Sequence, residues 1–338
     1  MKKSLLALAV LGAFAGVASA QTNVTVYGLV DAGIARENGA AGSVWKLATG
    51  VQSGNRLGFK GTEDLGGGLK ANFQLENGFN LDNGTQRQGA LFGRQAWVGL
   101  SGGFGSVSFG RQYDPLFIAL DTIDPFDTGL SGATTNLMGF GASGDVRVNN
   151  SINYTTNNFG GFSATALYGL GEVAGDNSKN RTYALSGTYA NGPVTAVLAY
   201  SNNNNATNTN TTKEWLLGGT YNFGVATAHL GYESEKNDAG VDYRDWMVGV
   251  SAPIGAGTVL ASFINKDDRS AANTGGAKQY ALGYTYALSK RTNLYTSYAH
   301  IKNDSGAAFV VGDASSGGNA VAAGNNSNAF AVGIRHKF

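Results

Sequence analysis

Along the last eleven residues of the chain, bulky and mostly apolar side chains alternate strictly with alanine, glycine or basic residues. In an extended strand, successive side chains point to opposite faces, so this segment has one apolar face and one face that can contact water. The apolar face carries Phe330, Val332, Ile334, His336 and Phe338. A closed outer-membrane β-barrel can use such a strand in its wall, with lipid outside and water inside. The pattern therefore predicts an all-β membrane protein.

The opposite end of the chain carries an export signal. Lys2 and Lys3 precede an apolar stretch at residues 5–17 that is too short to span a bilayer, and small residues follow it at Ala18, Ser19 and Ala20. We expect residues 1–20 to be a cleaved signal peptide and residues 21–338 to be the barrel. Loss of Lys2 and Lys3 would reduce the 24 basic residues to 22 against 23 acidic ones. A nearly neutral chain has no bulk attraction for nucleic acid.

The composition excludes a helical membrane protein. The chain is 42% hydrophobic, and no segment after the signal peptide has eighteen consecutive apolar residues. Its 51 glycines, 15 tyrosines and 17 phenylalanines, with only 4 prolines, suit many β-hairpins. The chain has no cysteine, so backbone hydrogen bonds and packing must stabilise it. A soluble repetitive β-protein remains the alternative.

Alternating segments of about ten residues recur along the mature chain. Short glycine-containing turns and longer polar loops such as 36–52, 203–212 and 304–327 connect them in alternation, as in barrels with short periplasmic turns and long external loops. The pattern predicts a transmembrane antiparallel β-barrel of 16 strands, at 24–35, 53–63, 69–80, 91–100, 105–112, 147–156, 162–169, 181–190, 194–202, 213–223, 225–235, 243–253, 258–267, 278–287, 293–303 and 328–338.

One connection, from Tyr113 to about Val146, is much longer than the others. Loops beyond about 12–15 residues are usually functional or disordered. This one contains many apolar residues, which indicates that it packs against the inside of the barrel. It is the third external loop of the predicted topology, and it carries Asp121, Asp124 and Asp127 without any lysine or arginine.

The predicted wall offers the opposite charge. Arg56 alternates out of phase with Leu57 and Phe59, Arg94 is out of phase with Trp97, and Arg147 is out of phase with Val148. These three arginines are therefore expected in the lumen, at a common level. Arg111 follows the phase of Phe109 and would need a bulge or a strand end to reach water. The alternative is that the arginines only pair with loop carboxylates.

Several segments resemble the general diffusion porins of Gram-negative bacteria, most closely the β-proteobacterial type. These are Ser53-Gly-Asn-Arg56-Leu-Gly-Phe-Lys60-Gly-Thr-Glu63, Phe92-Gly-Arg94-Gln-Ala-Trp97-Val-Gly-Leu100, Ser108-Phe-Gly110-Arg111-Gln, Asn150-Ser-Ile152-Asn-Tyr154 and the C-terminal Phe338. The resemblance covers the whole mature chain, and the motifs are highly specific in combination.

The resemblance implies a homotrimer in the outer membrane, in contact with lipid and lipopolysaccharide and inserted by the barrel assembly machinery. It also implies that the third external loop folds inward, with its acids facing a basic wall cluster. Arg56, Arg94 and Arg147 match that cluster, Asp124 and Asp127 are the best candidates for the loop acids, and Asp121 and Arg111 complete the expected constriction. Leu29 stands where enteric relatives have a constriction lysine.

No feature of the sequence favours an enzyme. The three histidines are isolated, and no His or Cys spacing suggests a metal site or a cofactor. We expect a water-filled channel for passive diffusion of small hydrophilic solutes and ions. A substrate-specific channel and a plugged adhesin or structural barrel are the rival hypotheses. Arginines fixed on rigid strands, and the resemblance, favour a weak anion preference, although the acidic residues of the loop argue the other way.

Overall fold

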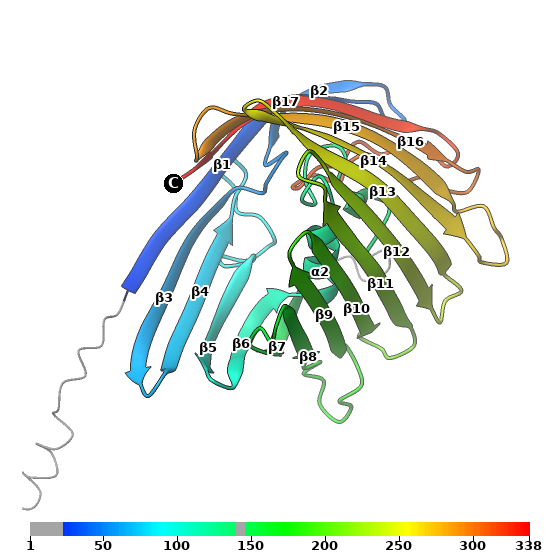
Figure 1. Ribbon diagram of the computed structural model, residues 1–338. Helices are drawn as coiled ribbons and strands as arrows, with labels where there is room; N and C mark the ends of the chain where they lie inside the picture. The colour runs from blue at the N-terminus through cyan, green and yellow to red at the C-terminus, as the bar shows by residue number, and fades with distance from the viewer. Residues whose placement is uncertain (1–22, 140–145) are drawn as a thin grey trace, which may run out of the picture.

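A computed structural model describes residues 23–139 and 146–338; the predicted signal peptide lies outside this part. One antiparallel sheet curls into a barrel (Figure 1). Its strands are β1 (Asn23–Glu37), β2 (Val44–Thr49), β3 (Arg56–Gly66), β4 (Leu69–Gly78), β5 (Gln95–Gly102), β6 (Gly105–Tyr113), β7 (Arg147–Thr155), β8 (Phe162–Gly169), β9 (Thr182–Asn191), β10 (Val194–Asn204), β11 (Thr211–Asn222), β12 (Thr227–Asn237), β13 (Asp242–Ile254), β14 (Gly257–Asp268), β15 (Ala277–Ala287), β16 (Thr292–Asn303) and β17 (Ser327–Lys337).

The first and last strands close the barrel. β1 pairs with β17 from Leu29 opposite Lys337 to Glu37 opposite Ala329. Two further backbone hydrogen bonds, both 3.0 Å, join Gly28 and Phe338. Closure leaves no free edge, which a sheet in lipid requires because unpaired backbone groups there find no water.

The predicted loop 36–52 contains a strand that the sequence analysis did not predict. β2 pairs with Ala32–Glu37 of β1, and β3 pairs with the preceding half of the same strand. Because both lie beside β1, they together occupy one position, and the wall is a 16-strand barrel as predicted. Residues 50–55 form the break between them. Trp45 and Leu47 of β2 are 63% and 60% exposed, on the outer face, which explains why this segment belongs in the wall.

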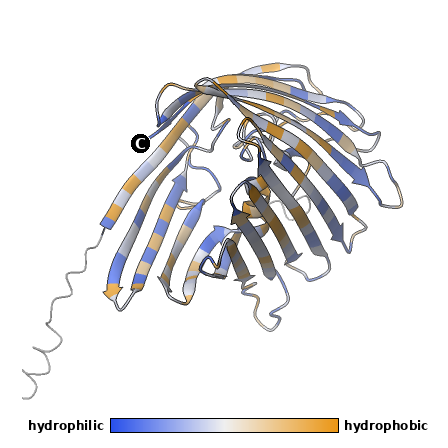
Figure 2. Cartoon of the chain, in the orientation of Figure 1, coloured by the Kyte–Doolittle hydropathy of each residue, from blue (hydrophilic) through white to orange (hydrophobic). Residues whose placement is uncertain are grey.

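The outer surface follows the alternation read from the sequence. On β11, Trp215 and Leu217 are exposed while Leu216 between them is fully buried. Apolar and polar residues alternate along most strands in Figure 2. Among the described residues, no helix is long and apolar enough to cross a membrane.

The long connection between β6 and β7 folds into the barrel, as predicted. It begins with α2 (Pro115–Ile123), capped by the Asp114 carboxylate on the backbone N–H of Leu116, and continues to the short helix η1 (Thr134–Asn136). Figure 1 shows α2 inside the wall, and it contacts strands β8 to β12. The loop and the inner wall share an apolar cluster that contains Leu116, Leu120, Ile123, Met138, Leu216, Met247 and Ile264. Burial of these side chains, at about 25 cal/mol per Å² of apolar surface, holds the loop in the lumen.

Candidate functional site

A charged cavity of about 470 Å³ lies between the inward loop, other loop residues and the wall at strands β3, β6, β7 and β17. Its charged lining residues are Arg56, Arg87, Arg94, Arg147, Arg335, Asp121, Asp127 and Asp313. Arg56, Arg147 and Arg335 belong to strands of the wall, Arg87 and Arg94 belong to the connection between β4 and β5, and the aspartates belong to two other loops. Of the seven predicted site residues, Arg56, Arg94, Arg147, Asp121 and Asp127 line this cavity.

Arg94 is fixed by the wall itself. Its Nε lies 2.7 Å from Oε1 of Glu76, and both side chains are almost fully buried. The second carboxylate oxygen of Glu76 accepts a 2.8 Å hydrogen bond from the Tyr27 hydroxyl. This charge-assisted pair engages both carboxylate oxygens of Glu76 and Nε of Arg94, and it positions the guanidinium rigidly. Arg94 thus presents its charge from a defined place in the lumen.

Tyr113 joins two arginines at the start of the inward loop. Its hydroxyl accepts hydrogen bonds from Arg94, at 2.8 Å, and from Arg147, at 2.6 Å. The Arg147 guanidinium also lies 4.3 Å from the centre of the Tyr113 ring, a cation–π distance. Arg56 is held by a 3.0 Å hydrogen bond from its Nε to the Gly54 carbonyl, in the break between β2 and β3. Backbone and ring contacts therefore hold the arginines close together despite their mutual repulsion.

The acidic side of the cavity consists of loop residues. Burial raises the pKa of Asp121, whereas a 2.7 Å hydrogen bond from the Thr128 hydroxyl and the charge of Arg56 lower it. Burial and the neighbouring Asp121 raise the pKa of Asp127. Burial also raises the pKa of Asp313, to about 7. In the part of the chain that the structure describes, no ion pair joins Asp121 or Asp127 to a wall arginine, although the charge of Arg56 acts on Asp121 and the charge of Arg335 acts on Asp127.

Asp124 does not line the cavity. It is 2% exposed, and its carboxylate accepts hydrogen bonds from the backbone N–H groups of Phe126, Thr128 and Thr134 at 2.8–3.1 Å, and from the Thr134 hydroxyl. These bonds fix a turn in which three non-glycine residues, Asp127, Thr128 and Leu130, have positive φ. Asp124 therefore shapes the loop from within.

Arg111 also lies outside the cavity. The register of β6 shifts between Gly110 and Gln112, but Arg111 still pairs with Ala96, on the face of Phe109 and Val98. Its Nε donates to the Gly93 carbonyl at 2.8 Å, and its Nη1 donates to Asn149 Oδ1 at 2.7 Å. The bulge that would have turned Arg111 into the lumen is present, yet the side chain remains with the outer set.

Three charged lining residues were missing from the predicted site. Arg335 could have been included, because the alternation of the last strand already placed it on the wet face. Arg87 and Asp313 lie in long loops, where periodicity does not show which way a side chain points.

The orientation expected for Trp97, away from the lumen, was wrong. Trp97 pairs with Gln74 and faces the lumen. Arg94 precedes the first residue of β5, so strand alternation does not relate the two residues.

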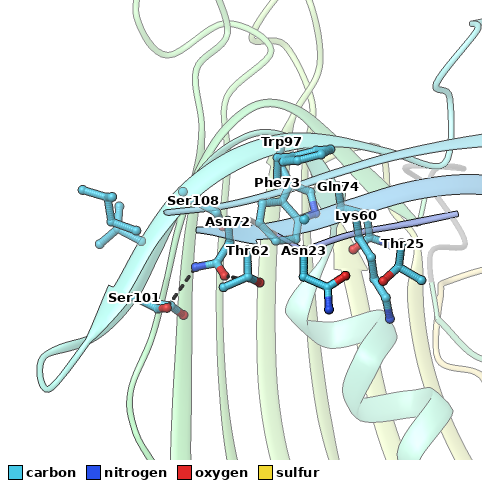
Figure 3. Close-up of a pocket in the computed structure, with 15 residues that line it drawn as sticks. Asn23, Thr25, Lys60, Thr62, Asn72, Phe73, Gln74, Trp97, Ser101 and Ser108 are labelled. Atoms are coloured by element: carbon cyan, nitrogen blue, oxygen red, sulfur yellow. Dashed lines mark hydrogen bonds between the residues drawn. The ribbon is translucent and has the colours of Figure 1, made fainter. Parts of the chain in front are cut away.

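A second cavity, of about 510 Å³, continues the lumen toward the short turns along strands β1 and β3 to β6. Figure 3 shows polar side chains along it, including Lys60, Asn72 and Gln74, with a 2.9 Å hydrogen bond between Asn72 and Ser101. Hydrogen-bonding side chains on this wall keep the passage hydrated.

Comparison with known proteins identifies the family. Residues 7–307 match the model of the Gram-negative porin family. The chain is 39% identical to outer membrane porin protein 32 of Delftia acidovorans over 355 residues, and 36% identical to an outer membrane porin of Bordetella pertussis over 403 residues. Each alignment covers 100% of both chains.

Solved structures agree with the sequence relatives. An anion-selective porin from Comamonas acidovorans superimposes with a TM-score of 0.84 at 36% identity, covering 94% of this chain and 100% of that one. An outer membrane protein of Vibrio cholerae in its trimer form has the same fold, with a TM-score of 0.73 at 16% identity over 94% of this chain and 99% of that one. Porins of this family are typically trimeric, non-enzymatic channels. The chain belongs to the Gram-negative porin family and forms a β-barrel channel in the outer membrane.

Proposed function

We propose that the charged cavity is the constriction of this channel, and that it admits small hydrophilic solutes and ions by passive diffusion with a preference for anions. The observation that carries the proposal is the imbalance of charge in the lining. Among the described residues, five arginines line the cavity, Arg56, Arg87, Arg94, Arg147 and Arg335, against the three aspartates Asp121, Asp127 and Asp313. Glu76 pairs with Arg94, so the positive charges of these described groups still outnumber the negative ones by one.

Sieving and electrostatics act together in this mechanism. The inward loop narrows the lumen, and a low-dielectric wall focuses the field of the arginines into the remaining passage. An anion entering the cavity is attracted to the wall, while the opposite aspartates create a transverse field that orders water and aligns polar solutes. Because the Debye length is about 10 Å at 0.1 M ionic strength, the preference should be greatest at low salt. The similar porin from Comamonas acidovorans is itself anion-selective, which supports the sign.

Reversal potentials in planar bilayers test the proposal. In a salt gradient, the protein should prefer chloride over potassium, and Arg56→Ser, Arg94→Ser and Arg147→Ser, singly and combined, should shift the reversal potential progressively toward cations. Arg269→Ser is the matched control, because Arg269 is 64% exposed and outside the cavity. An unchanged reversal potential in the triple variant would show that these arginines do not control selectivity.

A substrate-specific channel is the second candidate. The aromatic and polar residues on the lumen wall, including Trp97 and Lys60, support it. Conductance that saturates with one solute at low concentration would favour it, whereas conductance that scales with bulk conductivity supports general diffusion.

Four further proposals follow from the family. The chain assembles as a homotrimer, its outer surface contacts lipid and lipopolysaccharide, its C-terminal strand is recognised by the barrel assembly machinery, and residues 1–20 are removed on export. Light scattering of the native protein in mild detergent tests the first, because it distinguishes a trimer from a monomer. Mass spectrometry of the mature N-terminus tests the last, and cleavage after Ala20 is expected.

A further inference from the structure

A third cavity, of about 210 Å³, lies on the inner wall at the short-turn end of β14 to β17. Its floor crosses the sheet, because Thr258 pairs with Thr285 across β14 and β15, and Asn293 pairs with Arg335 across β16 and β17. The cavity shares Gln52 and Arg335 with the charged cavity. Short turns lie at the periplasmic end of barrels of this class, so we call it the periplasmic cavity.

The periplasmic cavity is basic. Its described lining residues include four cations and no carboxylate; the cations are Lys290, Arg291, Arg335 and Lys337. Lys290 and Arg291 belong to the turn between β15 and β16. Arg335 and Lys337 are two positions apart on β17, so they share the inner face of that strand. Two elements that are distant in the sequence therefore bring their positive charges to one place.

None of these four cations forms an ion pair with a carboxylate of the residues that the structure describes. Arg335 contacts neutral acceptors instead. Its Nε donates to Asn293 Oδ1 at 3.0 Å, and its Nη1 donates to Ser53 Oγ at 2.8 Å. The wall therefore holds the Arg335 guanidinium in position without neutralising it.

The charges around the cavity leave a positive excess. Arg335 and Arg56 repel Lys337, whereas Asp127 attracts it. Asp31 and Asp127 attract Arg335, but neither aspartate lines the periplasmic cavity. Four cations therefore face each other there, against two described acids that act on them from outside. A bound anion would relieve this repulsion.

The donors of the cavity suit an oxyanion. Ammonium and guanidinium groups are donors without acceptors, and the hydroxyls of Thr258 and Thr285 can donate as well. Charge-assisted hydrogen bonds to phosphate-like oxygens are short and strong, and a guanidinium can bind two such oxygens at once. One water occupies about 30 Å³ in the liquid, so the cavity has room for a small oxyanion and several waters. An anion with two charges gains more from four cations than chloride does.

We infer that the periplasmic cavity binds one small oxyanion with at least two negative charges, of the class of inorganic phosphate. The inference rests on the proposed anion preference, but it concerns a separate site. Binding is weak, because a channel must release the ions that it admits. The exposed cations Lys290, Arg291 and Lys337 supply the attraction, and the periplasmic cavity holds the anion next to the charged cavity.

Phosphorus NMR of inorganic phosphate tests the site with the full-length protein in detergent. At mildly alkaline pH and constant ionic strength, the protein should broaden the phosphate signal, and excess phosphate should saturate the effect. Lys290→Gln combined with Arg291→Gln should weaken the affinity about threefold or more, because each solvent-exposed ion pair contributes modestly. The turn should keep its shape, since the Ser289 hydroxyl accepts hydrogen bonds from the N–H groups of Arg291 and Thr292 at 3.2 and 3.0 Å.

Lys278→Gln combined with Lys302→Gln is the matched control. These exposed lysines pair with each other at the long-loop end of the same two strands, β15 and β16, outside the cavity. The control removes the same charge as the turn variant and should bind phosphate like the parent protein. Lys337→Gln is an independent second variant, and its phosphate affinity should fall as well.

Absence of saturable broadening with the parent protein overturns the inference, and so does undiminished binding in both the turn variant and Lys337→Gln. Binding that the turn variant retains and the combined Arg56→Ser, Arg94→Ser and Arg147→Ser variant loses would assign phosphate to the charged cavity, and would also overturn it. Reversal potentials in KCl separate the two proposals. A parent protein that prefers chloride but binds no phosphate contradicts only this inference, whereas one that binds phosphate here but prefers potassium contradicts only the proposed function.

Discussion

Asp124 and Asp127 are three positions apart in the same loop, yet they have different roles. The carboxylate of Asp124 is used by backbone N–H groups inside the turn, whereas Asp127 lines the cavity. The sequence analysis grouped them because both are acids of the same long loop and match the loop acids that the resemblance implies. Only the folded turn distinguishes an acid that builds the loop from an acid that faces the passage.

This difference predicts opposite results for the same substitution. Asp127→Asn removes a negative charge from the cavity and should shift the reversal potential toward anions with little effect on stability. Asp124→Asn loses buried acceptor capacity and should destabilise the protein by about 1–3 kcal/mol without a comparable shift. Bilayer recordings and thermal unfolding of both variants check this. Equal shifts in reversal potential would show that both aspartates act on permeating ions.

Asp313 should make the selectivity depend on pH. Burial raises its pKa from the ordinary 3.8 to about 7, so lowering the pH through 7 protonates it and removes a negative charge from the cavity. Anion preference should therefore rise as the pH falls from about 8 to 6. Because the pKa of Asp313 is higher in the folded protein than in the unfolded chain, its protonation favours folding. This contribution to the folding stability is complete below pH 3.8 and is lost as the pH rises through about 7.

Reversal potentials measured across this pH range check the prediction. Asp313→Asn should reduce the pH dependence, while Asp304→Asn, an exposed residue of the same loop, should retain it. A profile that is identical in the parent protein and in Asp313→Asn would assign the pH dependence to other groups.

At the scale of elements, the tip of the inward loop is attached to the break between β2 and β3. The N–H of Leu130 donates to the Val51 carbonyl at 2.7 Å, and a Cβ at Gly129 would lie only 2.0 Å from the carbonyl oxygen of Gln52. Gly129 thus permits backbone-to-backbone contact. The break in the wall is what gives the loop tip a partner.

Gly129→Ala should detach this tip from the wall. A Cβ at that distance from a backbone oxygen forces a shift, so the open-channel current should become noisier and its mean should change. Gly187→Ala is the control, because a Cβ at Gly187 meets nothing within 4 Å. Single-channel recordings of both variants check the prediction. Currents identical to those of the parent protein would mean that the contact does not position the loop.

Periodicity predicted most of the barrel because lipid and water impose opposite demands on the two faces of each strand. It missed β2, whose alternation covers only six residues next to polar loop sequence. It also misplaced Trp97, because the phase of Arg94 does not extend into β5. Among the predicted site residues, those with a fixed strand phase, Arg56 and Arg147, line the cavity. Loop residues such as Arg87 and Asp313 depend on tertiary contacts that no local pattern encodes.

At the scale of the whole molecule, barrel closure depends on the last residue. Phe338 exchanges two backbone hydrogen bonds with Gly28, and a Cβ at Gly28 would lie 2.3 Å from the Phe338 ring, so the ring covers this glycine directly. The ring therefore sits at the seam where β17 meets β1. Without it, two backbone groups at the seam would face lipid unpaired, at a cost of several kcal/mol each.

Deletion of Phe338 should therefore impair closure and assembly together. We expect little folded protein in the outer membrane and an accumulation of unfolded chain in the periplasm, measured by fractionation and by the mobility of unheated samples in detergent gels. Phe338→Tyr keeps the backbone bonds and most of the ring contact, so it should assemble normally. Normal outer-membrane levels of the deletion variant would mean that the β1–β17 register from Leu29 to Glu37 closes the barrel without its terminal residue.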